Sequence, residues 1–202
     1  MIELYSGTPG SGKSYHATER VYYWLRDRKV IANYELQGLP SKKAANFIYK
    51  VNADITPAYL IDFAKKNHVQ RKESQTMVVI DEAGIKFNCR SWQDKDRLQW
   101  LDFFSQHRKY GFDIILIAQA DVMLDKQIRQ FIENDVNHRK LSSCGVYGKA
   151  VSVAYKFVAI TFWYGNRMRI GAQYIGYRKK IANLYNSWGT FNEVAEIETN
   201  HA

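Results

Sequence analysis

The sequence is poor in cysteine and in proline. Its 202 residues include two cysteines, Cys89 and Cys144, and three prolines. Two cysteines exclude a disulfide-dense secreted scaffold, and without a CxxC pair they do not resemble a typical zinc site. The low cysteine content favours a reducing, cytoplasmic setting.

Long hydrophobic runs are also missing. The longest apolar stretch, Phe157–Tyr164, is much shorter than the roughly 20 residues that a membrane-spanning helix needs. The first ten residues, MIELYSGTPG, have neither the basic start nor the apolar run of a secretory signal peptide. We therefore expect this chain alone to be soluble and not to cross a bilayer.

The residues that are present suit a folded, basic protein. Apolar residues make up 46% of the chain and aromatic residues 14%, which is ordinary for a domain with a buried core. The net charge is +9. Such a charge favours nucleic acid or the anionic inner face of a membrane as a partner, although surplus Lys and Arg also simply keep a protein in solution.

Apolar segments alternate between the two periods of secondary structure up to about residue 135. Short apolar runs predict strands, and residues spaced at helical period predict helices between them. This alternation predicts βαβ units and a parallel sheet. The expected strands are Ile2–Tyr5, Val30–Asn33, Met77–Ile80 and Ile114–Ala118, and the expected helices are Lys13–Arg28, one starting at Thr56-Pro57, Asp96–Tyr110 and one around Leu124–Ile132.

The pattern changes after about residue 136. Val151, Val153, Tyr155 and Phe157 alternate with smaller or polar residues, and glycines are frequent, which predicts strands and hairpins. We therefore divide the chain into a core at 1–135 and a β-rich C-terminal extension of the same domain at 136–202.

A phosphate-binding motif follows the first predicted strand. Gly7-Thr8-Pro9-Gly10-Ser11-Gly12-Lys13-Ser14 matches G-x-x-x-x-G-K-[ST], the P-loop or Walker A motif, at every fixed position. The glycines let backbone N–H groups turn toward phosphate oxygens, and the helix that follows directs its positive end to the same anion. Lys13 would reach the β- and γ-phosphates of ATP, and the Ser14 hydroxyl would coordinate Mg²⁺. The motif predicts an α/β P-loop NTPase three-layer fold with a mostly parallel central sheet.

Two adjacent acidic residues follow the buried strand 77–80. Asp81 would stand at its carboxyl end, where ligands bind in such sheets, and would hold Mg²⁺ directly or through water. Glu82 would orient and deprotonate the attacking water. The alternative is a polar strand end that faces solvent.

Two further residues are candidates for catalysis. Gln119 ends the strand 114–118, where its amide would sense the γ-phosphate or position the water. Arg108 is our candidate for an arginine finger, which would neutralise charge on the transferred phosphoryl group. Arg129 and Arg139 are rivals, and each of the three also suits a solvated surface.

These segments together resemble the zonula occludens toxin family, the assembly ATPases of filamentous phages. The P-loop from Tyr5 to Ser14 and the segment Val78–Gly84 occur in many ATPases. The more specific part is Phe104–Asp113, with His-Arg-x-x-Gly-x-Asp before a strand that ends in Gln119. The resemblance covers roughly residues 1–135 and continues more loosely to Tyr177-Arg-Lys-Lys and Leu184-Tyr-Asn-Ser187.

The resemblance implies an ATPase on the cytoplasmic face of the host inner membrane. Family members usually carry one membrane-spanning helix after this domain, and they resemble hexameric DNA-pumping motors. It implies a homo-oligomeric ring, envelope assembly proteins as partners, and extrusion of phage single-stranded DNA driven by ATP. The helix would follow this chain, and nothing here supports the toxin activity that named the family.

Three other functions fit the P-loop less well. A small-molecule kinase would avoid a water-activating base such as Glu82 beside Asp81. A GTP-driven switch would usually need an Asn-Lys-x-Asp stretch, which is missing. A non-catalytic module would not need Lys13, Ser14 and both acids together.

Basic and aromatic residues are interleaved near the end of the chain. Arg139-Lys140 and Arg178-Lys179-Lys180, with Tyr174, Tyr177 and Tyr185, would suit single-stranded DNA through charge and stacking. The same residues would also suit lipid headgroups, or a solvated face over core tyrosines.

Overall fold

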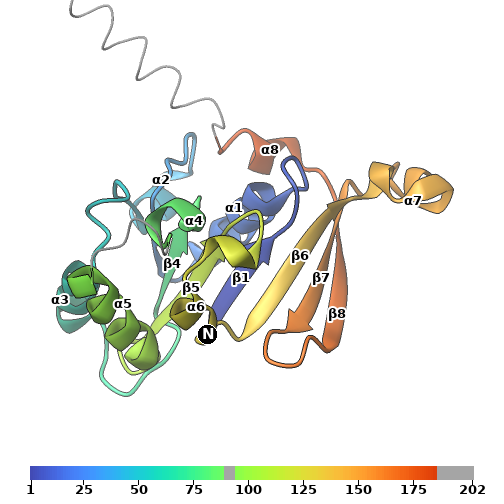
Figure 1. Cartoon of the computed structure of the whole chain (residues 1–202). Helices are drawn as coiled ribbons and strands as arrows, with labels where there is room; N and C mark the ends of the chain where they lie inside the picture. Colours follow the sequence, from blue (N-terminus) through green and yellow to red (C-terminus); the bar gives the residue numbers. More distant parts are fainter. Residues whose placement is uncertain (89–93, 186–202) are drawn as a thin grey trace, which may run out of the picture.

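One eight-stranded sheet organises the chain in the computed structural model, which describes residues 1–88 and 94–185 (Figure 1). The strand order is β3-β2-β4-β5-β1-β6-β7-β8. The first six strands in this order run parallel, and β7 and β8 are antiparallel additions at one edge. The strands are β1 (Ile2–Ser6), β2 (Lys29–Ala32), β3 (Phe47–Tyr49), β4 (Thr76–Ile80), β5 (Phe112–Ile117), β6 (Asn134–Lys140), β7 (Phe157–Trp163) and β8 (Arg169–Ile175).

Helices connect the strands and cover both faces of the sheet. They are α1 (Lys13–Trp24), α2 (Ser41–Ala44), α3 (Pro57–Asn67), α4 (Ala83–Lys86), α5 (Asp94–Gln106), α6 (Lys126–Arg129), α7 (Gly145–Val151) and α8 (Lys179–Ala182), with short 3-10 turns at Asp121–Met123 and Leu141–Ser143. In Figure 1, α7 projects beyond the ends of β6, β7 and β8.

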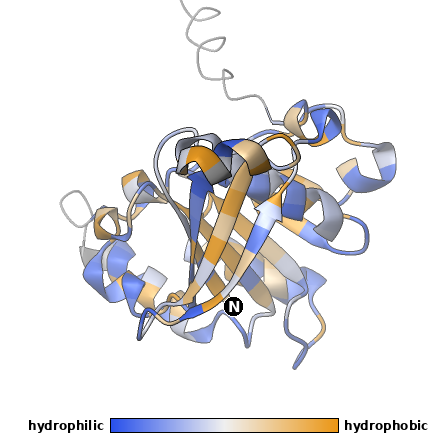
Figure 2. Cartoon of the chain, turned by 90° about the vertical axis from the view of Figure 1, so that its right-hand side faces the viewer, coloured by the Kyte–Doolittle hydropathy of each residue, from blue (hydrophilic) through white to orange (hydrophobic). Residues whose placement is uncertain are grey.

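The central strands consist mainly of hydrophobic residues (Figure 2). Their side chains form two cores, one on each face of the sheet. Ile114 and Leu116 of β5 belong to the core under α3 and α5, whereas Ile115 and Ile117 belong to the core under α1. This alternation follows from the two-residue period of a strand. The expected three-layer α/β fold with a mostly parallel sheet is confirmed.

Two helix ends differ from the sequence prediction. Helix α1 stops at Trp24 instead of Arg28, because Arg26 N–H bonds to Tyr23 O and the chain turns into β2. Helix α5 stops at Gln106, and a turn leads to Gly111, whose φ of 82° is the left-handed conformation that glycine adopts easily.

The predicted helix at 124–132 is a single turn, α6. Its periodic residues Leu124, Ile128 and Ile132 are nevertheless buried. The apolar spacing therefore identified core residues correctly, although most of the segment is not helical.

The strand predicted from the alternating pattern at 151–157 is wrong. Val151 ends helix α7, Val153 and Tyr155 are exposed, and β7 begins only at Phe157. The apolar residues at the exposed end of α7 and in the following turn happen to alternate at the two-residue period of a half-buried strand. Strand β6 spans 134–140 and pairs in parallel with β1, so the same sheet continues across residues 135 and 136.

Candidate functional site

The P-loop joins β1 to α1 in a conformation that depends on glycine. Gly7, Gly10 and Gly12 have φ values of 133°, 72° and 94°, which residues with a side chain rarely adopt. A Cβ on Gly12 would lie 2.5 Å from the ring of Phe157, and one on Gly7 would lie 2.4 Å from the carbonyl oxygen of His138. The loop is therefore shaped by backbone freedom and by close neighbours from β6 and β7.

Lys13 lies over this loop. Its ammonium donates to the carbonyl oxygens of Gly7 at 2.8 Å and Thr8 at 3.1 Å. Gly12 caps α1 without a side-chain hydrogen bond, so the first N–H groups of the helix are left for an anion. Desolvation lowers the pKa of Lys13, and the nearby Asp81 and Glu82 carboxylates oppose that shift.

The parallel sheet brings Asp81 to the P-loop. Strands β1 and β4 both end at this edge, with β5 between them. The Ser14 hydroxyl donates to Asp81 Oδ2 at 3.2 Å, although the two residues are 67 positions apart in the sequence. A hydroxyl and a carboxylate oxygen at this separation are the hard ligands that Mg²⁺ takes together with substrate phosphates, so the residues present fit this ion.

Asn33 fixes the backbone of Asp81, a role that the sequence did not suggest. Its side-chain amide donates to the carbonyl oxygen of Asp81 at 2.9 Å and accepts from the Asp81 N–H at 2.7 Å. Asn33 follows β2, whose neighbour in the sheet is β4. Strand pairing was the signal that could have placed Asn33 beside the site.

Glu82 and Gln119 lie at the same edge of the sheet. Glu82 adopts the left-handed conformation, with φ 49°, and its N–H donates to Asp81 Oδ1 at 2.9 Å. Its side chain is exposed. The backbone carbonyl of Gln119 accepts from the N–H of Gly7 at 3.1 Å. The fold thus brings Glu82 and Gln119 to the P-loop, where Lys13 and Ser14 also lie.

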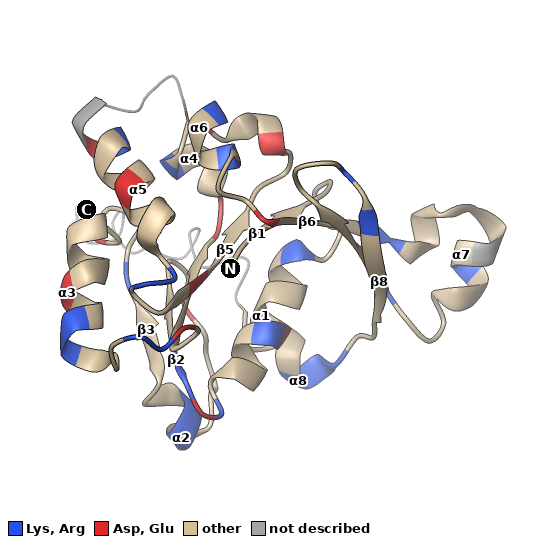
Figure 3. Cartoon of the chain, turned by 90° about the horizontal axis from the view of Figure 1, so that it is seen from below, with Lys and Arg blue, Asp and Glu red and all other residues tan. Residues whose placement is uncertain are grey.

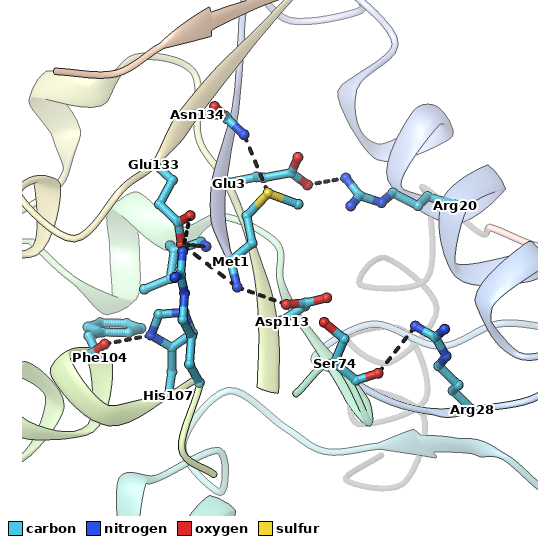
Figure 4. Close-up of polar contacts among 12 residues, drawn as sticks. Met1, Glu3, Arg20, Arg28, Ser74, Phe104, His107, Asp113, Glu133 and Asn134 are labelled. Carbon is cyan, nitrogen blue, oxygen red and sulfur yellow. Dashed lines mark hydrogen bonds and ion pairs between the residues drawn. The ribbon is translucent and has the colours of Figure 1, made fainter. Parts of the chain in front are cut away.

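Arg108 lies at the opposite edge, where the strands begin. It forms an ion pair with Glu133 at 2.5 Å, and the Met1 amino group lies between Asp113 and Glu133 (Figure 4). Arg108 precedes β5, whereas the P-loop follows β1, and parallel strands separate their two ends. The structure therefore does not bring Arg108 to the phosphate site of its own chain.

The rival Arg139 lies nearer the P-loop. It follows His138, whose carbonyl oxygen is close to Gly7, and its side chain is exposed and donates to Asn137 at 3.3 Å. Arg129 lies on α6, which packs against α5.

Two buried histidines lie next to Ser6, the residue before the P-loop. His16 Nδ1 and His138 Nε2 are 2.8 Å apart, and His138 Nδ1 is 3.3 Å from the carbonyl oxygen of Ser6. A carbonyl only accepts, so His138 carries its proton on Nδ1 and accepts from His16 through Nε2. Burial lowers the pKa of His16 to about 3 and that of His138 to about 4.

Tyr185 is a further residue at the site whose place the sequence did not reveal. Its hydroxyl is 3.1 Å from Asp81 Oδ2, the same oxygen that accepts from Ser14. Burial raises the pKa of Tyr185 to about 12, and the negative charge of Asp81 contributes to this rise. The phenol is therefore a neutral donor at physiological pH.

The strand order and this cluster of residues define a P-loop NTPase fold and site. The family model "Zonular occludens toxin (Zot)" matches residues 1–191, and the chain belongs to that family. The resemblance seen in the sequence is confirmed.

The chain is similar to the Gene 1 protein of Enterobacteria phage I2-2. The two are 29% identical over 152 residues, which are 72% of this chain and 42% of that protein. The chain thus spans less than half the length of this relative.

Two solved structures share the fold. The N-terminal domain of zonular occludens toxin from Neisseria meningitidis has a TM-score of 0.57 at 19% identity, covering 92% of this chain and 98% of that one. The genome packaging NTPase B204 from Sulfolobus turreted icosahedral virus 2, solved with AMPPCP, has a TM-score of 0.56 at 13% identity, covering 88% and 98%.

No helix among residues 1–88 and 94–185 is long and apolar enough to span a membrane.

Proposed function

We propose that this chain is the ATP-binding and hydrolysing motor domain of a filamentous phage assembly protein, which uses ATP while DNA is extruded through the host envelope. The observation that carries the proposal is the contact between Ser14 and Asp81 beside Lys13. It joins the two halves of an ATPase site that lie far apart in the sequence. Family membership and the Gene 1 relatives supply the phage context.

Each residue of the site has a distinct task in this proposal. Backbone N–H groups of residues 7–14 and the Lys13 ammonium hold the phosphates, including charge that develops during transfer. Ser14 and Asp81 hold Mg²⁺, which when bound supplies positive charge to the phosphate oxygens. Glu82 orients the attacking water and accepts its proton, and Gln119 senses the γ-phosphate. The B204 protein was solved in complex with AMPPCP, which supports a triphosphate ligand for this fold.

The partners belong to the proposal as well. We expect the longer protein to form a homo-oligomeric ring at the cytoplasmic face of the inner membrane and to act on phage single-stranded DNA with envelope assembly proteins. Because Arg108 is held by Glu133 far from its own P-loop, it would serve as an arginine finger only toward a neighbouring subunit.

Phosphate release from ATP and Mg²⁺ alone tests the proposal. Wild type should release phosphate steadily, whereas a small-molecule kinase would need an acceptor substrate. Glu82→Gln should lower turnover by about a hundredfold or more while ATP binding persists, because it removes the base. Glu73→Gln, a matched change in an exposed loop, should leave turnover unchanged. Equal turnover in Glu82→Gln and wild type would instead support a module that only holds nucleotide.

A further inference from the structure

The chain returns to the nucleotide site after its last strand. We call residues 176–185 the C-terminal strap. Ile181 of α8 and Leu184 are buried, so the strap packs firmly on the domain. The N–H of Gln37 donates to the carbonyl oxygen of Leu184 at 2.9 Å, and Leu36 and Tyr185 form an antiparallel bridge.

Tyr15 fixes the beginning of the strap. Its hydroxyl donates to the carbonyl oxygen of Gly176 at 3.1 Å and accepts from the N–H of Arg178 at 2.8 Å. Tyr15 directly follows Ser14 in the first turn of α1. The strap is therefore held at its start by the residue next to Ser14 in the sequence, and at its end Tyr185 contacts Asp81.

Packing restricts where the Tyr185 hydroxyl points. The ring lies edge-on to the buried ring of Tyr34, with centroids 5.3 Å apart and an interplanar angle of 81°. This contact and the bridge to Leu36 hold both the backbone and the ring of Tyr185. The hydroxyl then meets Asp81 Oδ2 at 3.1 Å, the same oxygen that the Ser14 hydroxyl meets at 3.2 Å.

We propose that Tyr185 is a positioning residue of the metal site: its hydroxyl orients the Asp81 carboxylate for Mg²⁺, so that the placement of the C-terminal strap sets the affinity for Mg²⁺-nucleotide. The inference rests on the proposed ATPase function. The Glu82 N–H holds Oδ1, and the hydroxyls of Ser14 and Tyr185 both hold Oδ2, so Tyr185 adds a second donor to that oxygen. A hydroxyl donates a hydrogen bond without bringing a positive charge, whereas Lys or Arg at this place would compete with Mg²⁺ for the carboxylate.

Magnesium dependence of nucleotide binding separates this role from simple packing. A fluorescent ATP analogue is titrated into Tyr185→Phe at a series of Mg²⁺ concentrations, and again in EDTA. The substitution keeps the ring against Tyr34 and removes only the hydroxyl. The Mg²⁺ concentration for half-maximal binding should rise roughly tenfold, which is the loss of one hydrogen bond to a charged group. Affinity in EDTA should match that of wild type.

A matched control variant and the wild type separate a failure of the Tyr185 proposal from a failure of the ATPase proposal. Tyr174→Phe removes an exposed hydroxyl from β8 and should leave the Mg²⁺ dependence unchanged. The inference is overturned if Tyr185→Phe shows the Mg²⁺ dependence of wild type, or if its affinity falls equally with and without Mg²⁺. If the wild type itself binds no nucleotide in Mg²⁺, the ATPase proposal fails instead.

Discussion

His16 and His138 make the stability of the folded chain depend on pH. Both imidazoles are buried and neutral. Protonation of His138 at Nε2 would remove the hydrogen bond that they share, and protonation of His16 would place a charge in a buried position. Their pKa values lie below the ordinary 6.5, at about 3 and about 4. Below pH 6.5 the unfolded chain therefore binds protons that the folded chain excludes, and stability falls as the pH drops through this window.

We predict that the free energy of unfolding decreases between pH 6.5 and about pH 4 by a few kcal/mol, at about 1.4 kcal/mol for each unit of pKa shift. Urea unfolding at a series of pH values measures this decrease. His16→Asn keeps a polar atom near Nδ1 but does not titrate, so its stability should change less over the same range. An identical pH dependence in wild type and variant would contradict the assignment.

Arg167 adds side-chain contacts to the backbone pairing that joins the β7–β8 hairpin to β6. Arg167 bonds to Asp135 at 2.8 Å and to Asp121 at 2.5 Å, and Asp135 also accepts from Ser6 at 2.6 Å. Ser6 directly precedes the P-loop. The arginine therefore links the antiparallel edge of the sheet to the strand that carries the phosphate site.

Arg167→Ala should lower the free energy of unfolding by about 1–2 kcal/mol, because Asp135 is left buried without its cation. The side chain of Asp135 is 8% exposed, but that of Arg167 is 52% exposed, so solvent moderates the effect. The control is Arg26→Ala, which removes an ion pair with Asp27 in which both side chains are mostly exposed and which should leave the free energy of unfolding nearly unchanged. Equal effects of both substitutions, measured in urea, would argue against this role of Arg167.

The sequence predicted elements well where periodicity and packing agree. Strands β4 and β5 were found from apolar runs because both of their faces are buried. Short elements such as β3 and α8 were missed, since three or four residues carry too little pattern. The hairpin was expected, but α7 before it was not, because exposed apolar residues disguised it.

The residues of the site that belong to contiguous motifs were predictable from the sequence. Residues 7–14 and 81–82 carry their chemistry in adjacent positions, and the parallel sheet brings these segments together. Asn33 and Tyr185 reach Asp81 only through strand pairing and the return of the strap, which no local pattern encodes. Arg108 was chosen for its place along the chain. Because it precedes β5, which runs parallel to β1, it lies at the edge of the sheet opposite the P-loop.

At the scale of the whole molecule, the net charge of +9 favours polyanionic partners, and among them the proposed function points to nucleic acid. Lys and Arg are spread over several elements, among them α2, α8 and β8 (Figure 3). Lys179 and Lys180 on α8 are exposed and lie in the strap that borders the nucleotide site. Under the proposed function, these two lysines are candidates to contact the phosphates of DNA.

We predict that single-stranded DNA binds and that its affinity falls with salt. Replacing Lys179 and Lys180 by Gln should weaken binding and reduce the salt slope by roughly 0.7 for each phosphate that is no longer neutralised. Replacing Lys65 and Lys66 on α3 by Gln changes the net charge equally and should have a smaller effect. Fluorescence anisotropy measures both. Equally weakened binding in the two double variants would show that only total charge matters.

Binding of ATP with Mg²⁺ by wild type and Lys13→Ala, measured by calorimetry, tests the account most directly. Wild type should bind, and Lys13→Ala should bind about ten- to a hundredfold more weakly with an unchanged circular dichroism spectrum, since it loses one charge-assisted hydrogen bond to phosphate. Lys149→Ala, an exposed lysine on α7, serves as the control. Wild type that binds no ATP, or Lys13→Ala that binds it as tightly as wild type does, would contradict a phosphate site at residues 7–14.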